Sequence, residues 1–129
     1  DNASGTAVLV TLTRMLADAD LAFTLRVVPF GSEESGLRRS RFYVQYLSDE
    51  ELENTKVMLN FDALGSGSGV SLFGDSNLTE MASVAGAEVG VEVAMNGGTS
   101  DLAIFRDAGV PFMMFLIAIP HASTPSATS

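Results

Sequence analysis

Five residues whose side chains bind metal ions or transfer protons stand at the ends of expected secondary-structure elements: Asp1, Glu33, Glu34, Asp62 and His121. Four of them follow apolar segments that are typical of β-strands, namely residues 23–30, 57–61 and 112–119. The remaining one, Asp1, precedes the first expected helix. Because ligands bind at the carboxyl ends of the strands in an open α/β sheet, we expect these side chains to share one edge of the sheet.

Carboxylates that converge in this way repel one another, so either some are protonated or a divalent cation neutralises them. Oxygen ligands combined with one imidazole nitrogen suit zinc, manganese or a pair of such ions. The adjacent Glu33 and Glu34 can divide the work, with one binding metal and the other accepting a proton from metal-bound water. The pattern therefore favours a metal centre at this edge.

Each of these residues also has a purely structural interpretation. Asp1 is in a position to cap the first helix, and a Glu-Glu pair after a strand is often the start of a solvated helix. Asp62 precedes Ala-Leu-Gly and fits a turn, while a single His121 after a buried strand is often structural. Only their coincidence at one edge favours the metal centre over these alternatives.

The composition excludes several other classes of function. The 129 residues carry 16 acidic and 7 basic side chains, and this net charge of −9 does not attract nucleic-acid phosphates or anionic membranes. The absence of cysteine excludes disulfides, thiolate metal sites and cysteine nucleophiles, and the single histidine excludes an HExxH zinc site. The longest apolar run, residues 112–119, is much shorter than the about 20 residues of a membrane span.

The hydrophobic pattern predicts helices that alternate with strands. Apolar residues spaced at helical intervals predict a first helix from Ala3 or Ser4 to a point before Asp20, and Ser48 followed by Glu51 is typical of a capping box. The other expected elements are helices at residues 37–47, 77–88 and 99–108 (the last with Thr99 or Ser100 as N-cap), strands at residues 70–73 and 89–94, and a turn at residues 65–69.

This alternation predicts an α/β fold, with a mostly parallel or mixed sheet flanked by helices. We expect one domain over residues 1–121, followed by a Ser/Thr-rich tail at residues 122–129.

Five sequence blocks then occur in the order in which a known enzyme family has them: DNASGTA at 1–7, FGSEESGLRRSRFYV at 30–44, LNFDALG at 59–65, GGTSD at 97–101 and FRDAGVPFMMF at 105–115. Together they resemble the co-catalytic di-zinc aminopeptidases of the secreted bacterial leucine aminopeptidase type. The resemblance implies the three-layer sandwich of zinc peptidases, here incomplete at its N-terminus. It also implies two zinc ions and the removal of N-terminal residues from peptide substrates.

The resemblance assigns a role to each candidate residue. Asp1 matches the carboxylate that bridges the two zinc ions, and Glu33 matches the general base. Glu34 matches a ligand of one zinc ion, and Asp62 matches a ligand of the other. His121 lies close to the position of the last zinc-binding histidine of the family.

The sequence departs from the family pattern at three places. The family has its first zinc-binding histidine upstream of the bridging aspartate, and these 129 residues contain no counterpart. The last zinc-binding histidine normally precedes Thr-Pro directly, whereas here Ser123 precedes Thr124 and Pro125. Leu102 follows Ser-Asp where the family usually has histidine.

Two functions therefore stay open: a zinc-dependent aminopeptidase domain, or a non-catalytic relative that acts as a self-assembling structural or binding protein. The strands that the family has and this sequence lacks would leave an unpaired sheet edge flanked by the apolar residues 23–30. We predict that the chain self-associates or binds a partner segment along that edge. The resemblance further implies that the protein is secreted.

Overall fold

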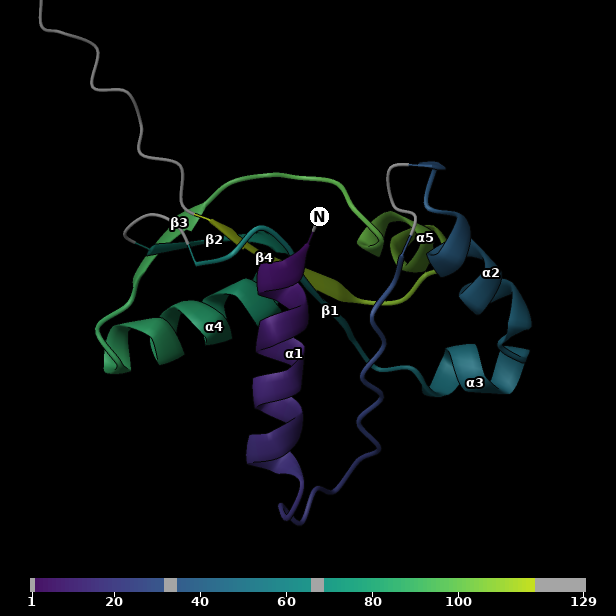
Figure 1. Ribbon diagram of the computed structural model, residues 1–129, viewed down its shortest axis with the longest axis horizontal. Helices are drawn as coiled ribbons and strands as arrows, with labels where there is room; N and C mark the ends of the chain where they lie inside the picture. Colours follow the sequence, from purple (N-terminus) through teal and green to yellow (C-terminus); the bar gives the residue numbers. More distant parts are fainter. Residues whose placement is uncertain (1, 32–34, 66–68, 118–129) are drawn as a thin grey trace, which may run out of the picture.

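The computed structural model describes residues 2–31, 35–65 and 69–117, which form a four-stranded sheet with helices around it (Figure 1). The strands lie in the order β1-β4-β2-β3, where β1 is Met58–Phe61, β2 is Gly69–Gly74, β3 is Glu92–Met95 and β4 is Phe112–Ile117. Strand β4 is parallel to β1 and antiparallel to β2, and β2 is parallel to β3. This mixed sheet with flanking helices confirms the expected α/β fold.

Strand β4 lies inside the sheet because its sequence is apolar on both faces. The side chains of Met113 and Met114 point to opposite faces, and both are buried, at 5% and 4% exposed. A strand with both faces covered has the continuous apolar run that predicted this element. The prediction is confirmed for residues 112–117, and residues 118 and 119 lie outside the described part of the chain.

The described residues form five helices: α1 Ala3–Leu16, α2 Arg38–Tyr46, α3 Asp49–Asn54, α4 Ser76–Glu88 and α5 Leu102–Asp107. Helix α1 packs against β1, α4 packs against β2 and β3, and α5 packs against β1, β4 and α2. In Figure 1, α2, α3 and α5 gather on one side of the molecule, while α4 lies on the other side and α1 crosses between them. The helices expected at the N-terminus and at residues 37–47 and 77–88 are confirmed.

Helix α3 begins with the predicted capping box. Ser48 Oγ accepts a hydrogen bond from the backbone N–H of Glu51 (3.1 Å), and Glu51 Oε2 accepts one from the backbone N–H of Ser48 (2.9 Å). The Ser48 N–H and the guanidinium of Arg26 both favour the ionised carboxylate, so the pKa of Glu51 is lowered. The contact between Arg26 and Glu51, at 3.2 Å, also ties α3 to the extended segment that contains Arg26.

The prediction of a strand at residues 23–30 is wrong, because this segment is extended but belongs to no strand. An extended segment becomes a strand only where a neighbouring backbone supplies hydrogen bonds, and no described strand pairs with it. Side-chain contacts hold the segment instead: Arg26 bonds the hydroxyl of Tyr43, and the ring of Phe30 packs edge-on against the ring of Tyr43 at 5.5 Å between centroids.

Two other elements begin later than predicted. Strand β3 begins at Glu92 rather than at residue 89, because Gly90 adopts a left-handed φ of 73° that ends the preceding helix. Helix α5 begins at Leu102, and its N-cap is Asp101 rather than Thr99 or Ser100. The tail at residues 122–129 and the centre of the predicted turn at 65–69 lie outside the described residues.

Candidate metal centre at the carboxyl end of β1

Asp62 stands where β1 ends, on the edge that the sequence predicted for the metal centre. Its backbone N–H donates to the carbonyl of Phe115 in β4 at 2.9 Å, which extends the parallel pairing by one residue. The next residue, Ala63, has a φ of 45°, a left-handed conformation that is unusual for a residue with a Cβ. The backbone therefore turns away sharply and leaves the half-buried Asp62 at the tip of the strand.

The N-terminus of α1 is tied to this same tip through Asn2. The amide Nδ2 of Asn2 donates to the carbonyl of Phe61 at 2.7 Å, and its Oδ1 accepts from the N–H of Ala63 at 3.3 Å. Asn2 Oδ1 also caps the helix by accepting from the N–H of Gly5 at 2.9 Å. One side chain thus bonds the residues on both sides of Asp62, and Asp1 is its direct neighbour in the chain.

A second hydrogen bond and a glycine also allow α1 to lie close to β1. Ser4 Oγ accepts a hydrogen bond from the N–H of Leu64 at 3.0 Å, which is a second bond between the first turn of α1 and the turn after Asp62. Gly5 faces the carbonyl of Phe61 so closely that an added Cβ would collide with it. A glycine at this place in the helix therefore permits the approach. The helix cap is Asn2, so the capping role considered for Asp1 belongs to its neighbour.

Replacement of Asn2 tests this connection. We expect Asn2→Ala to lower the free energy of unfolding by about 0.5–2 kcal/mol, because it removes the helix cap together with the bond to β1. Asn2→Asp keeps an acceptor for Gly5 but has no N–H for the carbonyl of Phe61, so we expect an intermediate loss. Urea unfolding followed by circular dichroism measures both, and an unchanged midpoint for Asn2→Ala would contradict the connection.

The chain on either side of the Glu33-Glu34 pair is also anchored near this edge. Before the pair, the ring of Phe30 packs against Tyr43 of α2 and against Phe105 of α5, the latter at 6.1 Å between centroids. After the pair, α2 begins, and its Ser40 is fully buried. Glu33 and Glu34 themselves lie outside the described residues.

Strand β4 leads to the same edge because it runs parallel to β1. Phe115 stands opposite Phe61, and the two rings stack at 4.8 Å with an interplanar angle of 5°. The last described residue of the strand is Ile117, and His121 lies outside the described part, as does Asp1. Of the five predicted site residues, Asp62 alone is described, and for the others the structure gives only the anchored neighbouring residues.

Asp101 is a residue of this region that the sequence reasoning missed. Its side chain is 7% exposed, and its pKa is raised, chiefly by burial and further by the negative charge of Asp62. The hydroxyl of Ser40 opposes this by favouring the ionised carboxylate. The signal in the sequence was the pair Ser100-Asp101, which matches the family block, but the interpretation as the start of a helix gave it no role.

The chemistry of the candidate donors fits a divalent cation. Carboxylate oxygens with one imidazole are a normal ligand set for zinc, and the burial of Asp101 beside Asp62 makes a nearby positive charge favourable. Within residues 2–31, 35–65 and 69–117, no three histidine or acidic side chains gather closely enough to hold a metal ion. A complete centre therefore requires the predicted donors that lie outside these ranges.

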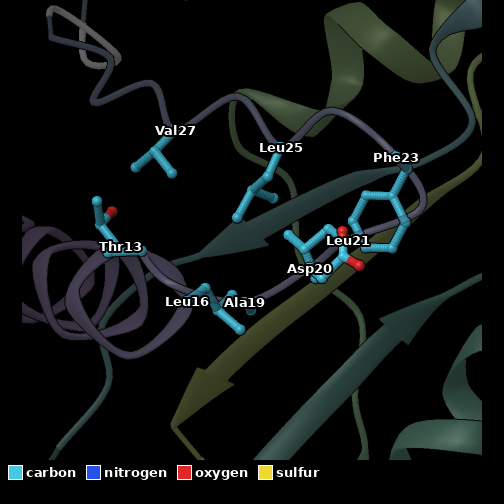
Figure 2. Close-up of a pocket in the computed structure, with 9 residues that line it drawn as sticks. Thr13, Leu16, Ala19, Asp20, Leu21, Phe23, Leu25 and Val27 are labelled. Atoms are coloured by element: carbon cyan, nitrogen blue, oxygen red, sulfur yellow. The ribbon is translucent and has the colours of Figure 1, made fainter.

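A hollow elsewhere on the molecule is distinct from this edge. It has a volume of about 400 Å³ and lies between the last turns of α1 and the extended segment after it (Figure 2). Leu16, Leu25 and Val27 line it, and Asp20 is its one acidic residue. Because α1 begins at the carboxyl end of β1 and rises about 1.5 Å per residue, its other end is roughly 20 Å away from Asp62.

Comparisons with known proteins agree with these features. The model of Peptidase family M28 matches residues 1–128. Aminopeptidase YwaD of Bacillus subtilis is 32% identical over 131 residues, which cover 94% of this chain and 29% of that protein. Leucine aminopeptidase 2 of Trichophyton rubrum is 41% identical over 66 residues, which cover 51% of this chain and 13% of that protein.

Solved structures show the same likeness. A zinc aminopeptidase from Bacillus subtilis superposes with a TM-score of 0.85 at 32% identity, over 95% of this chain and 32% of that one. An aminopeptidase from Aneurinibacillus sp. strain AM-1 superposes with a TM-score of 0.80 at 29% identity, over 92% of this chain and 30% of that one. The chain thus spans about a third of the length of these relatives.

Proposed function

This chain belongs to peptidase family M28, and on that premise we propose that it forms the metal-binding and catalytic segment of a zinc-dependent aminopeptidase. The observation that carries the proposal is the pair of hydrogen bonds between the Asn2 side chain and the residues on either side of Asp62. It joins the neighbour of Asp1 to the strand end that carries Asp62, although 59 residues separate Asn2 from Phe61. Two of the expected ligands thus belong to segments that are bonded to each other.

We assign the residues as follows. Asp1, Glu34, Asp62 and His121 hold zinc, and Glu33 accepts the proton of the attacking water and passes it to the leaving amine. Bound zinc supplies a Lewis acid that polarises the scissile carbonyl and lowers the pKa of water. The negative charges around the site also suit a substrate that carries a free ammonium group at its N-terminus. The substrate class is therefore a peptide with an unblocked amino terminus.

The experiment that tests this function is hydrolysis of a chromogenic leucyl amide by the purified chain. We expect hydrolysis with added zinc, loss of activity with a chelator, and recovery when zinc is restored. An N-acetylated leucyl amide is the matched control, because it lacks the free ammonium group and should be cleaved far more slowly. Equal cleavage of both amides, or hydrolysis that is insensitive to chelation, would contradict the assignment as a zinc-dependent aminopeptidase.

The relatives are named as aminopeptidases, and no observation favours the non-catalytic alternative.

We also propose that the chain associates with a second copy along the open side of its sheet. Among the described strands, β1 pairs with β4 alone, so its other edge has no strand beside it. Close to α1, the extended segment exposes large apolar side chains, with Phe23 at 65% and Leu25 at 45% exposed. Figure 2 shows Leu25 and Val27 directed toward the hollow that borders α1. An apolar surface next to an unpaired edge favours association.

Substitution of this surface tests the association. We expect light scattering to give a dimer or a larger species for the wild-type chain and a shift toward the monomer for Leu25→Lys, because the charge is costly to bury. Met81→Lys, on the exposed face of α4, is the control and should leave the mass unchanged. A wild-type chain that is a monomer at every concentration would contradict the proposal.

The cellular location follows from the family resemblance alone, and we propose secretion on that basis. None of the described helices is both long and apolar enough to cross a membrane. Detection of the natural gene product in culture supernatant, compared with the cell fraction, tests the proposed location.

A further inference from the structure

The buried carboxylate of Asp101 is a feature that the assigned roles leave unexplained. Its neighbours Ser100 and Leu102 are 4% and 0% exposed, so the side chain lies in one of the most buried parts of the molecule. Buried charged groups are normally paired or bound to a cation, because an isolated charge loses its hydration. Yet Oδ1 of Asp101 has no hydrogen-bond partner among the described residues, and no cationic side chain is found to act on it.

The surroundings of Asp101 relate it to two elements of the proposed metal centre. It precedes α5, and α5 packs against both β1 and α2. The hydroxyl of Ser40, in the first turn of α2, lowers the pKa of Asp101, and the negative charge of Asp62, just after β1, raises it. Asp101 therefore lies between the helix that follows Glu34 and the strand end that carries Asp62.

We propose that Asp101 is a positioning residue of the metal centre, whose buried carboxylate strengthens cation binding at Asp62. This inference rests on the proposed function. The negative charges of Asp101 and Asp62 repel each other when no cation is present. A divalent cation held by Asp62 is attracted by both carboxylates. The repulsion that destabilises the metal-free chain is therefore relieved when the cation binds, and this relief increases the affinity for the metal.

This role makes a prediction that a merely structural role does not. We expect Asp101→Asn to weaken zinc binding by about 10–100-fold, as is typical of residues that support metal ligands. The metal-free variant should unfold at the same temperature as the wild type or higher, because the repulsion with Asp62 is relieved. A merely structural residue would instead lower the unfolding temperature and leave zinc affinity unchanged.

The experiment is a competition titration of zinc with a chromophoric chelator, performed on the full chain. Asp107→Asn is the matched control, since Asp107 lies on the same helix, is 68% exposed and pairs with Arg106. We expect its zinc affinity to equal that of the wild type. Ser40→Ala provides a second variant, which removes the hydroxyl that favours the ionised carboxylate of Asp101, and we expect a smaller weakening in the same direction. This variant keeps the proposal testable if Asp101→Asn does not fold.

A double-mutant cycle with Asp62→Asn tests whether Asp101 acts through Asp62. We expect Asp101→Asn to have little further effect once Asp62 is replaced, and an undiminished effect would overturn the coupling. If the wild type and Asp101→Asn bind zinc equally, this inference is wrong while the proposed function stands. If the wild-type chain binds no zinc, both are wrong, so the two failures are distinguishable.

Discussion

Glu33→Gln is expected to reduce the rate of leucyl amide hydrolysis by about 10²–10⁴-fold while zinc stays bound. The amide of glutamine is close in size to the carboxylate but does not accept a proton, so the variant removes the general base and little else. Steady-state kinetics should place the loss in kcat rather than in KM, because Glu33 acts on the attacking water and not on the bound peptide.

The neighbouring Glu34→Gln is the matched comparison for this prediction. We expect it to lose both zinc and activity, since Glu34 is assigned as a ligand and glutamine is a poor zinc ligand. Metal analysis of the two variants therefore separates two adjacent residues of the same type. Retention of zinc by Glu34→Gln together with its loss in Glu33→Gln would reverse the two assignments.

Asp62→Asn is expected to weaken zinc binding by more than 100-fold, a larger effect than that of a residue which only supports a ligand. The fold should survive, because the backbone N–H of Asp62, rather than its side chain, bonds Phe115 at 2.9 Å. Loss of this carboxylate also removes the repulsion with Asp101, so the metal-free variant should be no less stable than the wild type.

Asp75→Asn is the contrasting control for Asp62→Asn. Its Oδ2 accepts a hydrogen bond from the N–H of Phe112 at 2.7 Å, at the start of β4 and thus at the opposite end of that strand from the proposed metal centre. We expect this variant to lose about 1 kcal/mol of stability and to keep its zinc affinity. Thermal unfolding and zinc titration should therefore separate the two variants: Asp62→Asn loses zinc affinity and keeps its stability, whereas Asp75→Asn loses stability and keeps its zinc affinity. Equal zinc affinity in Asp62→Asn and the wild type would remove Asp62 from the metal centre.

The local patterns of the sequence predicted those elements that local physics determines. The apolar run of β4 indicated a strand covered on both faces, and Ser48 with Glu51 indicated the start of α3. The parallel pairing of β1 and β4, which the site argument required, is also present. Each of these elements carries its own signal within a few residues of sequence.

The predictions from the sequence that were wrong or missing concern features that depend on distant residues. Residues 23–30 have strand-forming side chains, but a strand also needs a paired neighbour, and no described backbone provides one. Asn2 was passed over because its importance comes from Phe61, 59 residues away. Asp101 was missed for the same reason, since its burial arises only when α5 packs against α2 and β1.

Equilibrium dialysis of the purified chain against zinc, followed by metal analysis, tests most directly whether acidic groups from separate segments form one metal centre. We predict about two bound zinc ions per chain, with binding strongly reduced by Asp62→Asn and unaffected by Asp75→Asn. No bound zinc, or equal amounts in the wild type and Asp62→Asn, would contradict the account.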